Sequence, residues 1–275
     1  DHQRFVQAEA FDVTYGGGES NVAVSLKNYG LDASFITKVP DNPIGQCAIN
    51  HLRRYGVNTE HIVCGGERLG IYFLESGASQ RPSKVVYDRA NSAIATAAES
   101  DFDWEKIFTG ADWFHFTGIT PALSESAARI TLTAAKTAKQ MGLSVSCDLN
   151  YRKKLWSTEK ARQVMSGLME YVDVAVGNEE DAEKVFGIKA KGSDVHSGEL
   201  SREGYQEVAR KLVKRFGLRK VAITLRESYS ASDNGWSGML YDGQDYYFSK
   251  QYDIRIVDRV GGGDSFAAGL IYGLL

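Results

Sequence analysis

The sequence lacks long hydrophobic runs and paired cysteines. No apolar run approaches the roughly 18 residues expected of a transmembrane helix, and Asp1–Ala10 is too polar for a secretory signal. The three cysteines, Cys47, Cys64 and Cys147, are odd in number and lie outside any CxxC spacing. This pattern fits free thiols in a reducing compartment rather than a disulfide framework or a zinc site. The sequence therefore predicts a cytoplasmic protein.

The sequence also lacks a large excess of positive or negative charge and a metal-binding pattern of histidines. The formal net charge is −3, which gives no electrostatic case for nucleic acid or an anionic membrane as a partner. The five histidines form no HExxH or similar ligand pair, and His115 stands in an apolar run that favours a core position. A histidine-based metalloenzyme or triad hydrolase is therefore disfavoured, and any anion site must be local.

Helical and strand patterns alternate along most of the chain. The alternation indicates βαβ crossovers, and so a mostly parallel sheet with helices on both faces. Helices are expected at Ser20–Tyr29, Gly45–Tyr55, Ser124–Met141, Thr158–Tyr171, Tyr205–Phe216 and Asp264–Leu275. Strands are expected at Ala33–Val39, Ala111–Thr117, Leu143–Leu149, Val172–Val176 and Lys220–Leu225.

Two segments interrupt this rhythm. Leu69–Tyr87 contains two strand-like runs without a helix between them, and Arg4–Thr14 also lacks helical closure. We expect these segments to form a small second sheet. The predicted division is an αβα core at 15–68 and 91–275, with this small β-sheet at 1–14 and 69–90. The polar insertion Lys189–Ser201 is expected to be a surface loop.

A glycine run near the C-terminal end of the sequence carries the main chemical signal. Gly261, Gly262 and Gly263 lead directly into a helix that starts at Asp264. Glycines allow a tight turn, and a helix start offers unpaired N–H groups and the positive end of its dipole. Such a turn can hold a phosphate, and an Asp there can accept a proton from an attacking hydroxyl. Taken alone, the run also fits a glycine-rich turn capped by Asp264.

A second glycine run opens an early helix. Gly16, Gly17 and Gly18 precede Asn21, which falls in the first helical turn. Alone, this run is adequately explained as a permissive turn. Two such helix starts on one parallel sheet are better explained as two halves of one ligand cleft. Neither run is a P-loop or a GxGxxG dinucleotide fingerprint, which disfavours a dinucleotide-dependent oxidoreductase.

The two glycine runs, one followed by Asn21 and the other by Asp264, together resemble motifs of the ribokinase family of carbohydrate kinases, the phosphofructokinase-B type. Val39–Gly45 is similar to a further turn of that family, and Gly177–Asp181 is similar to its N-x-x-E motif. Within the family, Phe116–Leu123 and Asp148–Trp156 most resemble the strand-end motifs of 2-keto-3-deoxygluconate kinases. The resemblance runs through nearly the whole chain.

The resemblance implies a ribokinase-like fold with a small β lid that often serves in dimerisation. It implies ATP and Mg²⁺ as cofactors and a sugar acid as substrate, with Asp264 as the base and Gly261, Gly262 and Gly263 as the anion hole. The implied substrate-binding residues are Gly17, Asn21, Tyr72, Tyr87, Arg89, Arg152 and Asp264. The implied ATP-binding residues are Asn178, Thr224, Arg226, Gly261 and Gly263, with Asp181 or Glu180 acting on magnesium through water.

The sequence departs from the family pattern at three positions. Arg259 stands where a small residue is usual, Asp181 replaces the last Glu of N-x-x-E, and Arg226 replaces a Gly before a longer hairpin. Family members also usually have an earlier first strand and further helices after the catalytic Asp. We therefore expect this sequence to be part of a longer chain, and we assign no adenine contacts within it.

Three functions stay open at this point. The leading one is a 2-keto-3-deoxygluconate kinase that transfers the γ-phosphoryl group of ATP to the terminal hydroxyl of this sugar acid. The arginine at 152 favours an acidic substrate, because a guanidinium matches a carboxylate with two hydrogen bonds. By itself, however, Arg152 fits a surface ion pair equally well. A kinase for fructose, tagatose or a related sugar is the nearest alternative. A non-catalytic sugar- or nucleotide-binding relative is the other, favoured by the shorter acid at Asp181 and opposed by the intact glycine run before Asp264.

Overall fold

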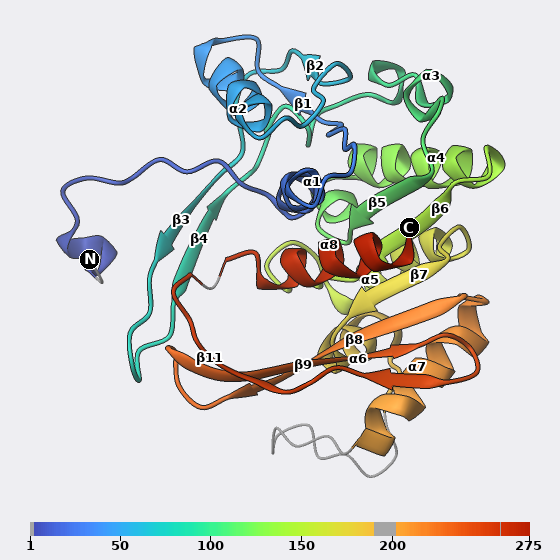
Figure 1. Cartoon of the computed structure of the whole chain (residues 1–275). Helices are drawn as coiled ribbons and strands as arrows, with labels where there is room; N and C mark the ends of the chain where they lie inside the picture. Colours follow the sequence, from blue (N-terminus) through green and yellow to red (C-terminus); the bar gives the residue numbers. More distant parts are fainter. Residues whose placement is uncertain (1–2, 190–201, 259) are drawn as a thin grey trace. The chain divides into compact units, whose positions relative to one another are not determined.

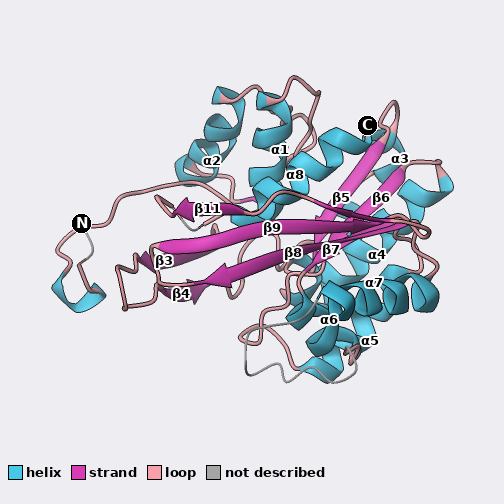
Figure 2. Cartoon of the chain, turned by 60° about the horizontal axis from the view of Figure 1, so that its bottom comes forward, coloured by secondary structure: helices cyan, strands magenta, loops and turns pink. Residues whose placement is uncertain are grey.

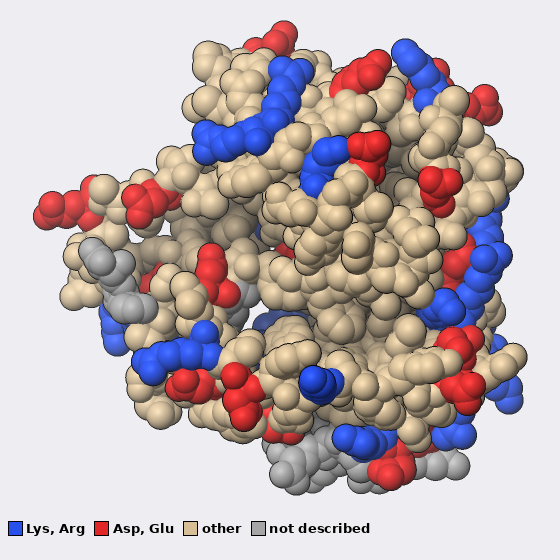
Figure 3. All heavy atoms as spheres, viewed as in Figure 1, with Lys and Arg blue, Asp and Glu red and all other residues tan. Residues whose placement is uncertain are grey.

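A computed structural model describes residues 3–189, 202–258 and 260–275 (Figure 1). The chain divides into two compact units. The first comprises Asp1–Ala97, Arg226–Trp236 and Gln251–Leu275, and the second comprises Ala98–Leu225 and Ser237–Lys250. Every helix in the described part of the chain is too short or too polar to span a lipid bilayer. On the face shown in Figure 3, Lys and Arg side chains are interspersed with Asp and Glu.

The second unit is built on parallel strands. β5 (Trp113–Thr117), β6 (Ser144–Asp148), β7 (Val174–Gly177) and β8 (Lys220–Ser228) lie side by side in chain order (Figure 2). The residues of β6 and β7 are almost all buried, as expected for strands covered on both faces. Beyond β8 the order continues with β9 (Asp233–Tyr241) and β10 (Tyr246–Phe248), which are antiparallel to each other.

The helices of the second unit connect these strands. They are α3 (Trp104–Phe108), α4 (Glu125–Gln140), α5 (Thr158–Met169), α6 (Glu179–Phe186) and α7 (Arg202–Phe216), with 3₁₀ turns at Glu99–Asp101 and Thr120–Ala122. Ser124 caps α4 as its sequence predicts, because its hydroxyl accepts a hydrogen bond from Ala127 N. Small buried residues such as Ala134, Ala135 and Ala138 let α4 pack closely in the core.

Asp173 joins three elements at the amino ends of the parallel strands. Its buried carboxylate accepts a hydrogen bond from the backbone N–H of Val145 at 3.0 Å. It also pairs with Lys139, at the end of α4, and with Arg219 at 3.1 Å, just before β8. The single carboxylate therefore ties α4, β6 and β8 together.

We expect Asp173→Ala to lower the free energy of unfolding by about 1–3 kcal/mol. The loss falls mainly on the buried Val145 N–H, because the side chains of Lys139 and Arg219, 37% and 71% exposed, can be hydrated instead. Urea denaturation measures the change. Lys160→Ala is the control, since its exposed pair with Glu125 should contribute less than about 0.5 kcal/mol. Equal stabilities of the two variants would contradict this role.

The first unit contains α1 (Gly18–Asn28), α2 (Pro43–Arg54), α8 (Gly262–Leu274) and a 3₁₀ turn at Phe5–Gln7. The strands β1 (Lys38–Val39) and β2 (Val63–Cys64) pair in parallel, and β11 (Tyr252–Arg255) pairs antiparallel with β9. Ala23, Leu52 and Val57 form a small apolar core. Gly45 is required where α2 begins, because a Cβ there would lie 2.0 Å from the Pro40 carbonyl oxygen.

Two further strands of the first unit form a separate antiparallel pair, which we call the β3–β4 ribbon. It consists of β3 (Ile71–Glu75) and β4 (Lys84–Asp88). The two strand-like runs expected in Leu69–Tyr87 are thus confirmed. The expectation that Arg4–Thr14 adds to this sheet is wrong. That segment contains only the 3₁₀ turn, and it contacts the ribbon through Phe11 against Phe73, with ring centroids 5.4 Å apart.

Most of the other predicted elements are confirmed to within a few residues. The strand expected at Ala33–Val39 is the main exception, because only Lys38–Val39 pairs as a strand, beside a single bridge from Ser34 to Asn58. The surface loop expected at Lys189–Ser201 lies, apart from Lys189, outside the described residues.

Candidate active site

Two helix starts meet in the first unit. Gly17 precedes α1 and Gly261 precedes α8, each at the N-cap position. In the first turns, the side-chain amide of Asn21 donates a hydrogen bond to Oδ2 of Asp264 at 2.7 Å, across 243 positions of sequence. Near the other ends of these helices, the rings of Tyr29 and Tyr272 lie 5.3 Å apart. The glycine runs that the sequence predicts to share one cleft are therefore brought together.

The backbone at this junction suits an anion. Gly261 has φ +86°, a conformation that side-chain-bearing residues rarely adopt. A Cβ on Gly261 would stand 3.5 Å from both Asn21 Nδ2 and Asp264 Oδ2. The first turn of α8 exposes Gly262 and Gly263. Because the first N–H groups of a helix have no intrahelical partner, this turn can donate hydrogen bonds to phosphate oxygens beside the Asp264 carboxylate.

We expect Gly262→Ala to reduce kcat by about tenfold, because a methyl group would crowd an anion at the start of α8. Stability should change little. Among the described residues, the added Cβ would contact the Trp236 ring, at an ordinary distance of 3.7 Å. Steady-state kinetics and thermal unfolding test the two parts separately. A variant that unfolds while retaining the activity of its folded fraction would make the glycine structural rather than functional.

Two tyrosines of the ribbon form a cluster with Arg89, the residue that follows β4. Tyr72 and Tyr87 are direct partners across β3 and β4, and their rings lie 6.4 Å apart. The Arg89 guanidinium lies over both rings, 4.5 Å from the centre of Tyr87 and 5.7 Å from that of Tyr72. These are distances at which a cation is attracted to a ring face. The three residues expected to meet a substrate from the ribbon therefore act as one group.

Tyr72 connects this group to Asp264. Burial raises the pKa of the Tyr72 hydroxyl, the nearby charge of Arg89 lowers it, and the charges of Asp258 and Asp264 raise it further. The Tyr72 hydroxyl also lies 3.9 Å from where a Cβ on Gly16 would stand. The Tyr72 hydroxyl therefore lies near the glycines before α1, within reach of the charge of Asp264.

The acidic residue of the N-x-x-E-like motif is a helix cap in the second unit. Asp181 accepts hydrogen bonds from Asn178 N at 3.2 Å and Tyr151 N at 2.9 Å, while the Asn178 side chain accepts one from Asp181 N. Burial raises the pKa of Asp181, although these backbone donors and Arg152 act against the rise. Its neighbour Glu180 is exposed. An Asn followed by an acid three residues later is the sequence pattern of a capping box, so this role of Asp181 could have been predicted from the sequence.

Arg152 follows an unusual backbone position. Asn150, at the end of β6, is buried and has φ +38°, which is uncommon for a residue with a side chain. Arg152 itself is exposed, and its Nη1 donates to the carbonyl of Tyr151 at 3.2 Å. Of the other predicted ATP contacts, Thr224 donates weakly to the Gly177 carbonyl at 3.5 Å. Arg259 lies outside the described residues.

Arg226 is held by a residue that sequence reasoning missed. Its Nε donates to Oδ1 of Asn234 at 2.8 Å, and Asn234 is only 1% exposed. An arginine and an asparagine eight positions apart, on either side of a turn, carry no recognised motif. Only the pairing of β8 with β9 brings them together.

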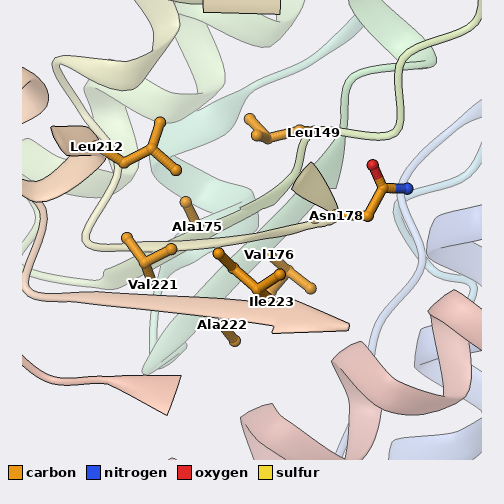
Figure 4. A pocket seen from close by; sticks show the side chains of 9 residues that line it. Leu149, Ala175, Val176, Asn178, Leu212, Val221, Ala222 and Ile223 are labelled. Carbon is orange, nitrogen blue, oxygen red and sulfur yellow. The ribbon is translucent and has the colours of Figure 1, made fainter. Parts of the chain in front are cut away.

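A small cavity in the second unit is apolar. It lies among β6, β7, β8 and α7, and its lining includes Leu149, Val176, Leu212 and Ile223 (Figure 4). Asn178 supplies the polar side chain at one end. The lining offers almost no hydrogen-bonding groups, so this space is a packing defect of the core rather than a second polar site.

The fold and the junction of α1 and α8 define a ribokinase-like α/β protein. The sequence matches the model of the pfkB family carbohydrate kinases over residues 2–275. The chain therefore belongs to the pfkB family of carbohydrate kinases, enzymes that transfer a phosphoryl group to an alcohol.

Individual relatives agree with this assignment. A solved structure of 2-dehydro-3-deoxygluconokinase from Thermotoga maritima is 55% identical, with a TM-score of 0.95, covering 100% of this chain and 82% of that one. The match confirms the ribokinase-like fold. A 2-dehydro-3-deoxygalactonokinase from Haloferax volcanii is 32% identical over 99% of this chain and 79% of its own length. A 2-dehydro-3-deoxygluconokinase from Bacillus subtilis is 28% identical over 98% and 76%.

Proposed function

We propose that this chain uses ATP to phosphorylate 2-keto-3-deoxygluconate, the sugar acid also called 2-dehydro-3-deoxygluconate, on its terminal hydroxyl. The products would be ADP and 2-keto-3-deoxy-6-phosphogluconate. The observation that carries the proposal is the Asn21–Asp264 hydrogen bond at two glycine-led helix starts. The 55% identity to a kinase named for this substrate supports the choice of sugar acid.

In the proposed reaction Asp264 accepts the proton of the terminal hydroxyl as its oxygen attacks the γ-phosphorus of ATP. The new O–P bond forms while the bond from phosphorus to the ADP oxygen breaks. The amide of Asn21 holds the carboxylate in one orientation. The N–H groups of Gly261, Gly262 and Gly263 donate to the phosphoryl oxygens, where negative charge must be stabilised in the transition state.

The sugar acid would be bound by groups of different chemistry. Tyr72, Tyr87 and Arg89 form the ribbon cluster already described, which offers two hydroxyls and a cation. Gly17 and Asn21 would meet the sugar at the start of α1. Arg152 would bind the carboxylate, since an exposed guanidinium can form two charge-assisted hydrogen bonds to it.

ATP would be bound by Asn178, Thr224, Arg226, Gly261 and Gly263, the positions that match the family motifs. Mg²⁺ typically binds through ATP phosphates, water and one or two carboxylates. Asp181 fits this role poorly, because its two oxygens already accept backbone hydrogen bonds. The exposed Glu180 fits it better, through a magnesium-bound water. When bound, the ion would neutralise charge on the phosphates.

Further parts of the proposal concern the role of the ribbon and the place in the cell where the protein acts. The β3–β4 ribbon, with residues 1–14 and 69–90, would act as a lid over the sugar on a core formed by 15–68 and 91–275. It would also mediate a homodimer, since Ile71, Leu74 and Val86 of the ribbon are exposed apolar side chains. The function is metabolic and would be carried out in the cytoplasm.

A kinase assay with four acceptors tests the function. We expect 2-keto-3-deoxygluconate to give the highest kcat/KM, with fructose and ribose far lower. Its galactonate epimer is the second candidate, because a 32% identical relative is named for it. A higher kcat/KM with the epimer would move the assignment to that acid. Activity on neutral sugars alone, or none at all, would overturn the sugar-acid proposal.

A further inference from the structure

Two turns of the first unit are bound to each other. One is the β3–β4 turn, residues 76–83 at the tip of the ribbon, and the other is the β8–β9 turn, residues 229–232 (Figure 1). Ala231 N donates to the Ser79 carbonyl at 2.9 Å, and Ser79 N donates to the Ser232 hydroxyl at 3.3 Å. The tip of the ribbon is thus held at a point distant in sequence from its own strands.

Both turns are held by bonds within themselves. In the β3–β4 turn, Arg81 pairs with Glu75 at 2.7 Å and donates to the Ser76 carbonyl. In the β8–β9 turn, the Ser230 hydroxyl accepts hydrogen bonds from the backbone N–H groups of both Ser232 and Asp233. The contact at Ser79 therefore joins two internally bonded turns.

Asn234 connects the β8–β9 turn to Arg226. Its Nδ2 donates to the Ser230 carbonyl at 3.1 Å, and its Oδ1 accepts from Arg226 Nε at 2.8 Å. The side chain is almost fully buried, so both hydrogen bonds are protected from water. A single amide therefore fixes the turn that holds the ribbon and the arginine that we assign to ATP.

The ribbon needs this support because an isolated pair of strands is only marginally stable. Its base is fixed by the Arg68–Asp88 ion pair at 2.6 Å, and its middle carries Tyr72 and Tyr87. The contact at Ser79 fixes its tip. Any shift of the β8–β9 turn would therefore change how the tyrosines and Arg89 face the sugar.

We propose that Asn234 is a positioning residue for both substrates, because it holds the ribbon through the β8–β9 turn and holds Arg226 directly. The proposal rests on the proposed function, because Arg226 and the ribbon are assigned to the two substrates there. It predicts that the two hydrogen bonds of Asn234 serve different substrates.

Asn234→Asp separates the two hydrogen bonds. The carboxylate can still accept from Arg226, but it cannot donate to the Ser230 carbonyl. We expect KM for the sugar acid to rise about two- to tenfold, the usual range for one lost hydrogen bond, while KM for ATP stays within about twofold. Asn234→Ala loses both bonds, so both KM values should rise. Arg226→Gln should raise KM for ATP alone.

Controls distinguish the positioning role from general damage to the fold. Glu227 follows Arg226 in β8, and its carboxylate accepts hydrogen bonds from Tyr229 and Gln251. Glu227→Gln should leave both KM values within about twofold of the wild-type values. Ser232→Ala removes one bond of the turn contact and keeps the proposal testable if the Asn234 variants do not fold. It should raise KM for the sugar acid, about twofold or more, and not KM for ATP.

The KM ratios decide the proposal. The positioning role would be overturned by equal changes of both KM values in Asn234→Asp. It would also be overturned if neither Asn234→Asp nor Ser232→Ala changed a KM value more than twofold. The ratios can be measured with whichever sugar the wild-type enzyme phosphorylates. A wild-type protein that is inactive on 2-keto-3-deoxygluconate but active on another sugar would thus overturn the proposed substrate, and the same measurement would still decide the positioning role.

Discussion

Asp264→Asn should lower kcat by about 100-fold or more, while KM for both substrates changes much less. An amide has the size and polarity of the carboxylate but cannot accept the proton of the attacking hydroxyl. Its oxygen can still accept the hydrogen bond from Asn21, so the junction of α1 and α8 should remain intact. Because the lost interaction belongs to the transition state, the effect should fall on kcat.

Steady-state kinetics on the folded variant provides the measurement. Asp253→Asn is a matched control, since Asp253 is an exposed acid of β11 in the same unit and should change kcat by less than twofold. Asn21→Ala should give an intermediate loss, about tenfold, because it frees the carboxylate to rotate without removing it. A folded Asp264→Asn variant with near wild-type turnover would exclude Asp264 as the base.

Arg152→Ala should raise KM for the sugar acid by about 10- to 150-fold, the range for a lost hydrogen bond to a charged group. KM for ATP should stay nearly unchanged. The cost to the fold should be small, because Arg152 is exposed and donates a hydrogen bond to the carbonyl of the adjacent Tyr151. The effect should therefore appear in binding rather than in thermal stability.

Two variants and a second substrate refine this test. Arg152→Lys keeps the charge but loses the planar pair of donors, so its KM should fall between those of wild type and Arg152→Ala. Lys153→Ala, at the next exposed residue, is the control and should change KM by less than twofold. If activity on fructose falls as much as activity on the sugar acid, Arg152 positions its loop and does not recognise a carboxylate.

Local signals explain which elements could be predicted from the sequence. Ser124 and Gly142 mark the ends of α4, because capping and chain reversal depend on residues within one turn of the helix. The glycine runs before α1 and α8 likewise indicated two helix starts. The expectation that the two starts meet followed from the general rule that ligands bind where parallel α/β sheets open. The hydrogen bond between Asn21 and Asp264 was not itself predicted.

Long-range contacts explain what the sequence did not predict. The short β1 depends on where β2 passes, and Arg4–Thr14 lies against the ribbon through Phe11 instead of joining it as a strand. Asn234 shows no pattern at all until β8 and β9 pair. Asp181 is a different case, since its capping role was visible locally but a catalytic motif offered a competing interpretation of the same residues.

The bond between Asn21 and Asp264 also bears on when activity can appear during synthesis. The two residues are 243 positions apart, so the bond cannot form before α8 has been made. A nascent chain that ends before α8 lacks Asp264, the residue that we propose as the base. Under the proposed function, such a chain cannot yet phosphorylate a sugar.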